Sequence, residues 1–181
     1  LHPDWPDNVN PLRVGIAENG WNTFSVQMPV LEHKAKYYDY VSLFPESSQR
    51  IESTLEYLTE KGFSKIILLA HSCGAHMAMF YLDKYGDKKI DAFIGIGMGA
   101  TDYKQEMINP FPFATIKKPI LDIYSTNDYP AVIRLAPKRL KAIKLGANKL
   151  SEQVMLPYED HFFTNDVTIL NETIITWLST I

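Results

Sequence analysis

The stretch from Lys65 to Phe80 constrains the fold more than any other part of the sequence. It reads Lys-Ile-Ile-Leu-Leu-Ala-His-Ser-Cys-Gly-Ala-His-Met-Ala-Met-Phe, an apolar run followed by small and polar residues and then by a second, largely apolar segment. This order predicts a buried strand, a tight turn and a helix. A buried strand that leads directly into a helix is typical of a parallel sheet covered by helices.

The remaining segments alternate in the same way from end to end. Short apolar runs bounded by turn residues predict strands, and apolar residues three or four positions apart predict helices. We expect helices at 10–18, 45–62, 74–85, 130–145 and 166–180, and strands at 21–28, 65–70, 90–96, 120–125 and 152–156. The sequence therefore predicts a single domain over residues 1–181, of the α/β class, with a mostly parallel sheet and helices on both faces.

Charge and hydropathy exclude several kinds of partner. The chain has 18 basic and 21 acidic residues, a formal net charge of -3, and no run of Lys or Arg long enough to follow a phosphate backbone. We therefore expect no nucleic-acid partner.

No membrane span is expected either. The apolar runs at 66–70 and 92–98 are far shorter than the about 20 residues of a membrane-spanning helix. Residues 1–11 are polar, unlike a secretory signal, and the single cysteine, Cys73, excludes an internal disulfide.

Ser72 lies at the centre of the predicted turn, with Ala70 two positions before it and Gly74 two positions after it. This spacing is typical of a nucleophile elbow, in which a strained serine projects from the sheet edge and small neighbours let strand and helix approach. The backbone N–H of Cys73 would then face an oxyanion at the start of the helix. Cys73 is the alternative nucleophile, but its thiol lies one residue past the centre and is expected to be buried or half-buried. An ordinary turn capped by a serine is the alternative structure.

A serine nucleophile needs a histidine as base and an acid that orients it. In this type of fold the acid comes after the serine in the chain, and the histidine comes after the acid. His161 lies between the last expected strand and the last expected helix, so it is the predicted base. Asp128 comes just past the strand at 120–125, at the edge where open α/β sheets place their chemistry. Asp122 within that strand and Asp160 beside His161 are the alternative acids. The other histidines are expected to pack or to line the pocket: His2, His33, His71 and His76.

Neither a metal nor a cofactor is expected. The histidines and acids lack ligand spacing, such as two histidines one turn apart on a helix. Gly95, Gly97 and Gly99 form a glycine run, but we expect it within a strand, without the lysine and the following helix that a phosphate-binding loop requires.

Together with the elbow, four other segments resemble the α/β-hydrolase superfamily, and more narrowly a poorly characterised bacterial family within it. They are His2-Pro3-Asp4-Trp5-Pro6, Gly20 to Pro29, Asp122 to Pro130, and Asp160-His161-Phe162-Phe163. The resemblance begins late in the fold, so it implies that the first strands of the α/β-hydrolase fold are lacking in this chain. Similar proteins draw a second oxyanion N–H from a loop that would precede Leu1. Either the natural chain extends further at this end, or the oxyanion hole is incomplete.

The resemblance implies the same catalytic triad that the spacing indicates, Ser72, Asp128 and His161. We therefore expect a serine hydrolase that acts on an ester or thioester of a small-molecule acyl substrate through an acyl-enzyme. A peptidase or an acyltransferase with the same triad is also compatible with the sequence. The alternative from a different class is a non-catalytic α/β-hydrolase-like module that binds a ligand or partner.

Substrate access in this fold depends on the segment between the strands at 90–96 and 120–125. Residues 97–119 contain three prolines together with Phe111 and Phe113, too little for a lid of several helices. These phenylalanines could form an apolar rim that, with His71, contacts the substrate, or they could pack a plain crossover loop onto the sheet. In either case we expect an open site and no interfacial activation by lipid.

Overall fold

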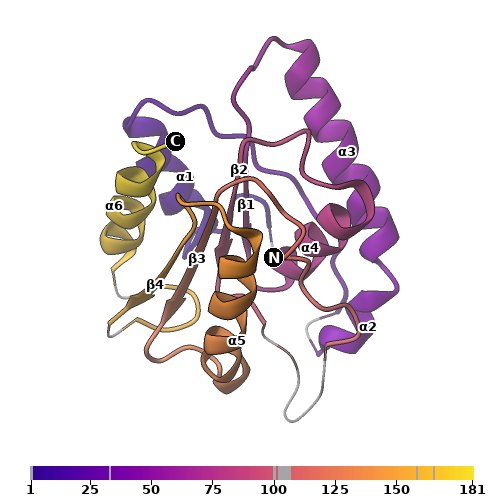
Figure 1. The fold of residues 1–181 in the computed structure, drawn as a ribbon, viewed down its shortest axis with the longest axis vertical. Coiled ribbons are helices and arrows are strands. Elements are labelled where there is room, and N and C mark those ends of the chain that lie inside the picture. Colours follow the sequence, from indigo (N-terminus) through magenta and orange to yellow (C-terminus); the bar gives the residue numbers. More distant parts are fainter. Residues whose placement is uncertain (1, 33, 100, 102–106, 158, 165) are drawn as a thin grey trace.

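The computed structural model of the protein describes residues 2–32, 34–99, 101, 107–157, 159–164 and 166–181. Helices and strands alternate along the described chain (Figure 1). They are α1 (Val9–Glu18), α2 (Tyr37–Val41), α3 (Phe44–Glu60), β1 (Ile67–His71), α4 (Cys73–Tyr85), β2 (Ala92–Ile96), β3 (Ile120–Ser125), α5 (Pro130–Gly146), β4 (Glu152–Leu156) and α6 (Val167–Leu178). None of the described helices is long and apolar enough to cross a membrane.

The described strands form one parallel sheet in the order β1-β2-β3-β4. In this register Ala70 lies beside Gly95, and Gly95 lies beside Asp122. Because all the strands run the same way, their carboxyl ends meet at one edge of the sheet, and the turns that leave them lie close together. The predicted α/β class with a parallel sheet is therefore confirmed.

Different helices cover the two faces of the sheet. Side chains alternate along a strand, so neighbouring residues of β2 point to opposite faces. Phe93 packs in a cluster with residues of α3, α4 and α5, whereas Ala92 and Ile94 pack in a second cluster with α1 and α6. Figure 1 shows α1 and α6 together on one side of the sheet and α3 and α4 on the other. The predicted helices on both faces are thus present.

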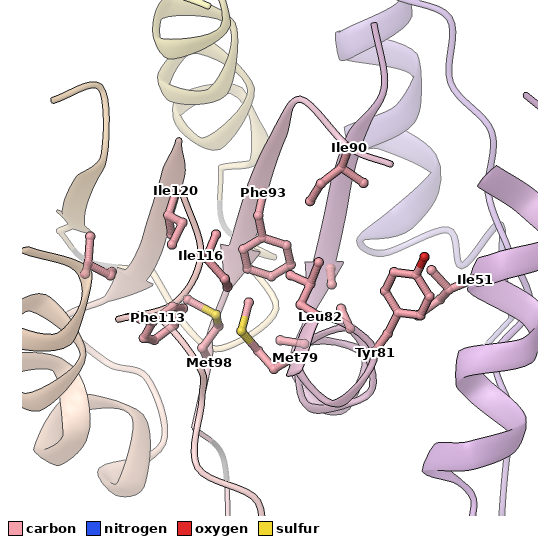
Figure 2. Close-up of a cluster of buried hydrophobic side chains, with 14 of the residues drawn as sticks. Ile51, Met79, Tyr81, Leu82, Ile90, Phe93, Met98, Phe113, Ile116 and Ile120 are labelled. Atoms are coloured by element: carbon pink, nitrogen blue, oxygen red, sulfur yellow. The ribbon is translucent and has the colours of Figure 1, made fainter. Parts of the chain in front are cut away.

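The first of these clusters fixes helix α4 against the sheet. Figure 2 shows Met79 and Leu82 of α4 lying against Phe93 and Ile90 of the β2 region. All four side chains are fully buried, and each such burial contributes about 1.5–3 kcal/mol. Since α4 begins one residue after Ser72, this packing also fixes where the turn at Ser72 lies.

Most predicted elements agree with the structure to within two or three residues. The strands expected at 120–125 and 152–156 are β3 and β4, and the helix expected at 74–85 is α4, which begins at Cys73. Helix α2 was not predicted, because its five residues are too few for a helical period to be recognised.

The strand expected at Trp21–Met28 is wrong, because these residues form neither strand nor helix in the structure. A strand requires a ladder of backbone hydrogen bonds to a neighbour. Here side chains make the local contacts instead: the Ser25 hydroxyl donates to the carbonyl of Pro3, and Arg50 donates to the carbonyl of Gln27 at 2.6 Å. The apolar alternation does not mark one buried side either, because Phe24 is 57% exposed while Thr23 and Ser25 beside it are partly buried.

Asp122 and Arg139 form a buried ion pair between β3 and α5. The Asp122 Oδ2 atom accepts hydrogen bonds from Arg139 Nε at 2.7 Å and from Gln153 Nε2 at 2.7 Å. Arg139 Nη1 also donates to the carbonyl of Met98 at 2.7 Å. Because the two charged side chains are 0% and 3% exposed, water competes little for these bonds. The pair therefore joins β3, β4, α5 and the turn after β2.

Replacing Arg139 with Met should lower the free energy of unfolding by about 3–5 kcal/mol, because the Asp122 carboxylate would stay buried without its cation. The double variant Asp122→Leu, Arg139→Met should be more stable than Arg139→Met, since it removes the uncompensated charge. Urea unfolding at pH 7 measures both differences. A single variant as stable as the unmodified protein, or a double variant less stable than the single one, would contradict this role.

Candidate active site

Ser72 stands between the end of β1 and the start of α4 with a backbone φ of +53°. A residue other than glycine in this region costs about 1–3 kcal/mol, and it persists only when its surroundings hold it there. The Ser72 N–H donates to the carbonyl of Ile96, at the end of β2, at 2.9 Å. The strained turn is thus attached to the carboxyl edge of the sheet, and it has the backbone geometry of a nucleophile elbow.

The small residues beside Ser72 differ in what they contribute. Ala70 is buried in the core, as close packing between strand and helix requires. A Cβ atom added at Gly74, in contrast, would meet no heavy atom within 4 Å. The sequence predicted that a small residue is needed at Gly74 to let strand and helix approach. This is wrong, because no described residue lies where a Cβ atom at Gly74 would be.

His161 forms hydrogen bonds with both Ser72 and Asp128. Its Nε2 atom lies 2.7 Å from Ser72 Oγ, and its Nδ1 atom lies 2.6 Å from Asp128 Oδ1. A carboxylate only accepts hydrogen bonds, so Nδ1 carries the ring proton and Nε2 accepts from the serine hydroxyl. Three separate turns at the carboxyl edge of the sheet bring these predicted site residues together.

Asp128 is held by the turn that follows β3. Its Oδ1 atom also accepts from the N–H of Tyr129 at 2.7 Å, and its Oδ2 atom accepts from the N–H of Ser125 at 3.5 Å. The carboxylate is fully buried. Asp128 therefore caps its own turn, the alternative role for such a residue, and at the same time faces the imidazole of His161.

The two alternative acids have other partners. Asp122 is paired with Arg139 inside the fold. Asp160 accepts hydrogen bonds from the N–H of Phe162 at 2.9 Å and from the hydroxyl of Thr164 at 2.7 Å. Although partial burial opposes it, these bonds lower the pKa of the Asp160 carboxyl. Asp160 thus shapes the backbone of the loop that carries His161.

Aromatic side chains surround the His161 ring. The ring of Tyr129 stacks on it with 4.1 Å between centroids and 26° between planes, and Phe162 contacts it edge-on at 5.1 Å. The His161 side chain is 3% exposed, whereas Tyr129 is 47% exposed. Tyr129 therefore shields one face of the imidazole from water while its own outer face is open to solvent.

Gly97 leaves room for the His161 ring. Its φ is +59°, and a Cβ atom there would lie 2.8 Å from His161 Cε1 and 3.0 Å from Nδ1. The expectation that the glycine run lies within a strand holds for Gly95 only, because β2 ends at Ile96. Sequence reasoning missed this contact; a glycine directly after a buried strand, at the edge where the site was expected, is the signal that could have indicated it.

Cys73 is the first residue of α4, whose opening N–H groups have no acceptor within the helix. Burial raises the pKa of its thiol to about 11. The thiol therefore stays protonated near neutral pH and is a poor nucleophile. These properties agree with the expected half-buried, unreactive thiol beside a backbone N–H that is free of the helix ladder.

The three predicted substrate contacts occupy different environments. The ring of His71 makes a hydrogen bond to the carbonyl of His161. Phe111 is half-buried, with its ring centroid 5.4 Å from that of Phe113. Phe113 is 1% exposed and lies among the core side chains of Figure 2, so the expected substrate contact is wrong for Phe113, which packs onto the sheet. Residues 100 and 102–106 of the expected rim lie outside the described residues.

The remaining histidines lie away from this arrangement or outside the description. His76 is buried and packs against the ring of Tyr37 at 4.6 Å, as expected for a histidine on the helix behind the elbow. His2 is exposed and accepts from the N–H of Asp4 at 3.0 Å. His33 is outside the described residues. Among the residues that the structure describes, no group of three or more His, Cys, Asp or Glu side chains could hold a metal ion.

Asn8 supports the loop of His161 and was missed by sequence reasoning. It is 2% exposed, and its Nδ2 atom donates to the carbonyl of Phe162 at 2.6 Å. An asparagine just before a helix predicts a cap, yet the Asn8 side chain makes no capping bond. Its true partner lies 154 residues further along the chain, and no local pattern indicates such a contact.

The parallel sheet, its covering helices and the strained elbow together define an α/β-hydrolase fold, and solved structures share it. A predicted CIB-like hydrolase from Thermoplasma acidophilum matches with a TM-score of 0.68 and 14% identity, over 93% of this chain and 76% of that one. XC6422 from Xanthomonas campestris, described as a serine hydrolase without a lid, matches at 0.60 and 12%, over 94% and 73%. Esterase RhEst1 from Rhodococcus sp. ECU1013 matches at 0.59 and 14%, over 92% and 84%. At these identities the likeness concerns the fold alone.

The family follows from the sequence match. Residues 42–180 match a family described as protein of unknown function (DUF3530), and the chain belongs to this family. The matched range contains Ser72, Asp128 and His161. A search of curated proteins gave no match.

Replacing Gly97 with Ala should destabilise the fold more than the same change at Gly62, by about 1 kcal/mol or more. Both glycines have a positive φ, +59° and +84°, so both variants carry backbone strain. Only the Cβ at position 97 would also meet His161, since nothing lies within 4 Å of the one at Gly62. Urea unfolding of the two variants measures the difference. Equal losses would show that His161 does not pack against Gly97.

Proposed function

We propose that this chain is a serine hydrolase that cleaves esters or thioesters of small-molecule acyl substrates through an acyl-enzyme. The observation that supports the proposal is the continuous hydrogen-bonded chain from Ser72 through His161 to Asp128, with contacts of 2.7 and 2.6 Å. A hydroxyl that donates to an imidazole, which in turn donates to a buried carboxylate, is the arrangement that activates serine for acyl transfer.

The first half-reaction transfers the acyl group to the protein. His161 Nε2 takes the Ser72 proton while Oγ forms a bond to the acyl carbon, and the carbonyl oxygen becomes an oxyanion. The Asp128 carboxylate stabilises the imidazolium that results. When the tetrahedral intermediate collapses, the bond to the alcohol or thiol breaks, and His161 gives its proton to that leaving group.

The second half-reaction releases the acid. A water molecule attacks the acyl carbon and gives a proton to His161 Nε2. Collapse of the second intermediate breaks the bond to Ser72 Oγ, which recovers the proton from His161. The products are a carboxylic acid and the free protein, and the reaction needs no oxidant or reductant.

The oxyanion requires donors near Ser72. We assign one of them to the backbone N–H of Cys73, because it opens a helix of 13 residues whose dipole favours negative charge at this end. The Cys73 thiol has no part in this step. Loss of a single such donor typically lowers the rate by about 10²–10³.

We expect short, soluble acyl esters as substrates. Ser72 is only half-buried, and the exposed face of Tyr129 lies next to the catalytic histidine, so a small ester could reach the hydroxyl from solvent. The similar fold of XC6422 is described as lacking a lid, which agrees with open access. Phe111 is half-buried beside His76 and stays a predicted apolar contact for the substrate, whereas Phe113 belongs to the core.

The chain should hydrolyse p-nitrophenyl acetate, and Asp128→Asn should lower kcat by up to about 10⁴, because an amide no longer fixes the productive histidine tautomer. The matched variant Asp160→Asn changes the carboxylate next to His161 in sequence but outside the triad. Because its amide oxygen can still accept from the N–H of Phe162, it should lower kcat less than tenfold. Steady-state rates at pH 7.5 compare the two. No hydrolysis by the unmodified protein, or a larger loss from Asp160→Asn than from Asp128→Asn, would contradict the proposal.

A further inference from the structure

His71 links the strand that carries Ser72 to the loop that carries His161. It is the last residue of β1, and its ring Nε2 atom lies 2.8 Å from the backbone carbonyl oxygen of His161. A carbonyl oxygen only accepts, so Nε2 of His71 carries a proton and donates it. The two imidazole rings are also in contact, with 4.9 Å between their centroids.

His71 makes this bond in its neutral form. Burial, together with the proximity of His161, lowers the pKa of His71 to about 4. Above that pH the ring is uncharged, and its single proton is on Nε2, where the carbonyl needs it. The bond therefore persists through the neutral range without placing a second positive charge beside the imidazolium that forms on His161 during acyl transfer.

The loop of His161 depends on such side-chain bonds. It joins β4 to α6, and its described residues take part in no sheet ladder. Asn8 holds the carbonyl of Phe162, and Asp160 holds the N–H of Phe162. His71 adds a bond to the carbonyl of His161 itself. Because His71 and Ser72 are adjacent, this bond sets the position of the base directly against that of the nucleophile.

We propose that His71 is a positioning residue that fixes the backbone of His161 relative to Ser72, and not a substrate-binding residue as the sequence suggested. The proposal rests on the proposed function, in which His161 Nε2 must meet the proton of Ser72. A shift of about 1 Å in a positioned group can lower the rate by about 10², so loss of this one bond is measurable in kcat.

Two amide substitutions separate positioning from mere bulk. In His71→Gln the side-chain amide nitrogen occupies about the position of Nε2 and can still donate to the carbonyl, whereas in His71→Asn it reaches only the position of Nδ1. We expect His71→Gln to keep kcat for p-nitrophenyl acetate within about fivefold of the unmodified protein. His71→Asn should lower kcat by about 10². KM should change less than threefold in both variants, because His71 does not hold the substrate.

The contrary outcomes are distinct. Equal kcat values for Gln and Asn, or an effect confined to KM, would overturn the positioning role, and urea unfolding of both variants shows whether a loss follows stability instead. If the unmodified protein does not hydrolyse the ester, the proposed function fails, and long-range ¹H–¹⁵N NMR then tests the bond alone. A neutral His71 with its proton on Nε2 at pH 7 supports the bond, and a proton on Nδ1 overturns it.

Discussion

The site depends on how the backbone of Ser72 is held at its positive φ of +53°. Such a residue is strained by about 1–3 kcal/mol, so neighbouring structure must hold it in place. On one side β1 pairs in parallel with β2, and the Ser72 N–H continues that pairing to the carbonyl of Ile96. On the other side α4 starts at once, and its buried side chains, such as Met79 and Leu82, fix it on the sheet. The position of the Ser72 hydroxyl therefore follows from the pairing of β1 with β2 and from the packing of α4 on the sheet.

The imidazole of His161 is held in a different way, by single contacts with residues distant in the chain. His71 and Asn8 hold two successive carbonyls of its loop, Gly97 provides space for the ring, and Tyr129 covers it. Most of these groups are uncharged at neutral pH. The buried carboxylate of Asp128 is the charged group that hydrogen-bonds to the His161 ring. In the reaction proposed above, a preorganised surrounding of this kind would stabilise the positive charge that forms on the ring.

Much of the fold could be predicted because apolar periodicity records burial directly. The strands β3 and β4 and the helix α4 follow from such runs, and Ser72, Asp128 and His161 follow from where those runs end. The segment Trp21–Met28 shows the limit of that reasoning, because an alternating pattern does not show whether a neighbouring strand is present to pair with. The structure brings the side chains of Ser72, Asp128 and His161 together, and their catalytic roles stay predictions.

The contacts that the sequence did not indicate join residues far apart in the chain. Asn8 and Phe162 are 154 positions apart, and His71 and His161 are 90 apart. No local sequence pattern indicates a contact between residues so far apart in the chain. The size of Gly74 was misread for a related reason, since the space around a helix start depends on elements that the local motif does not contain.

Intact-protein mass spectrometry after treatment with a fluorophosphonate probe tests the central claim, that Ser72 is an activated nucleophile. At pH 7.5 we expect one adduct per chain, located on Ser72 by peptide mapping, absent in Ser72→Ala and retained in Cys73→Ala. An unlabelled protein, or an adduct that persists in Ser72→Ala, would contradict it and would favour a non-catalytic module or another nucleophile.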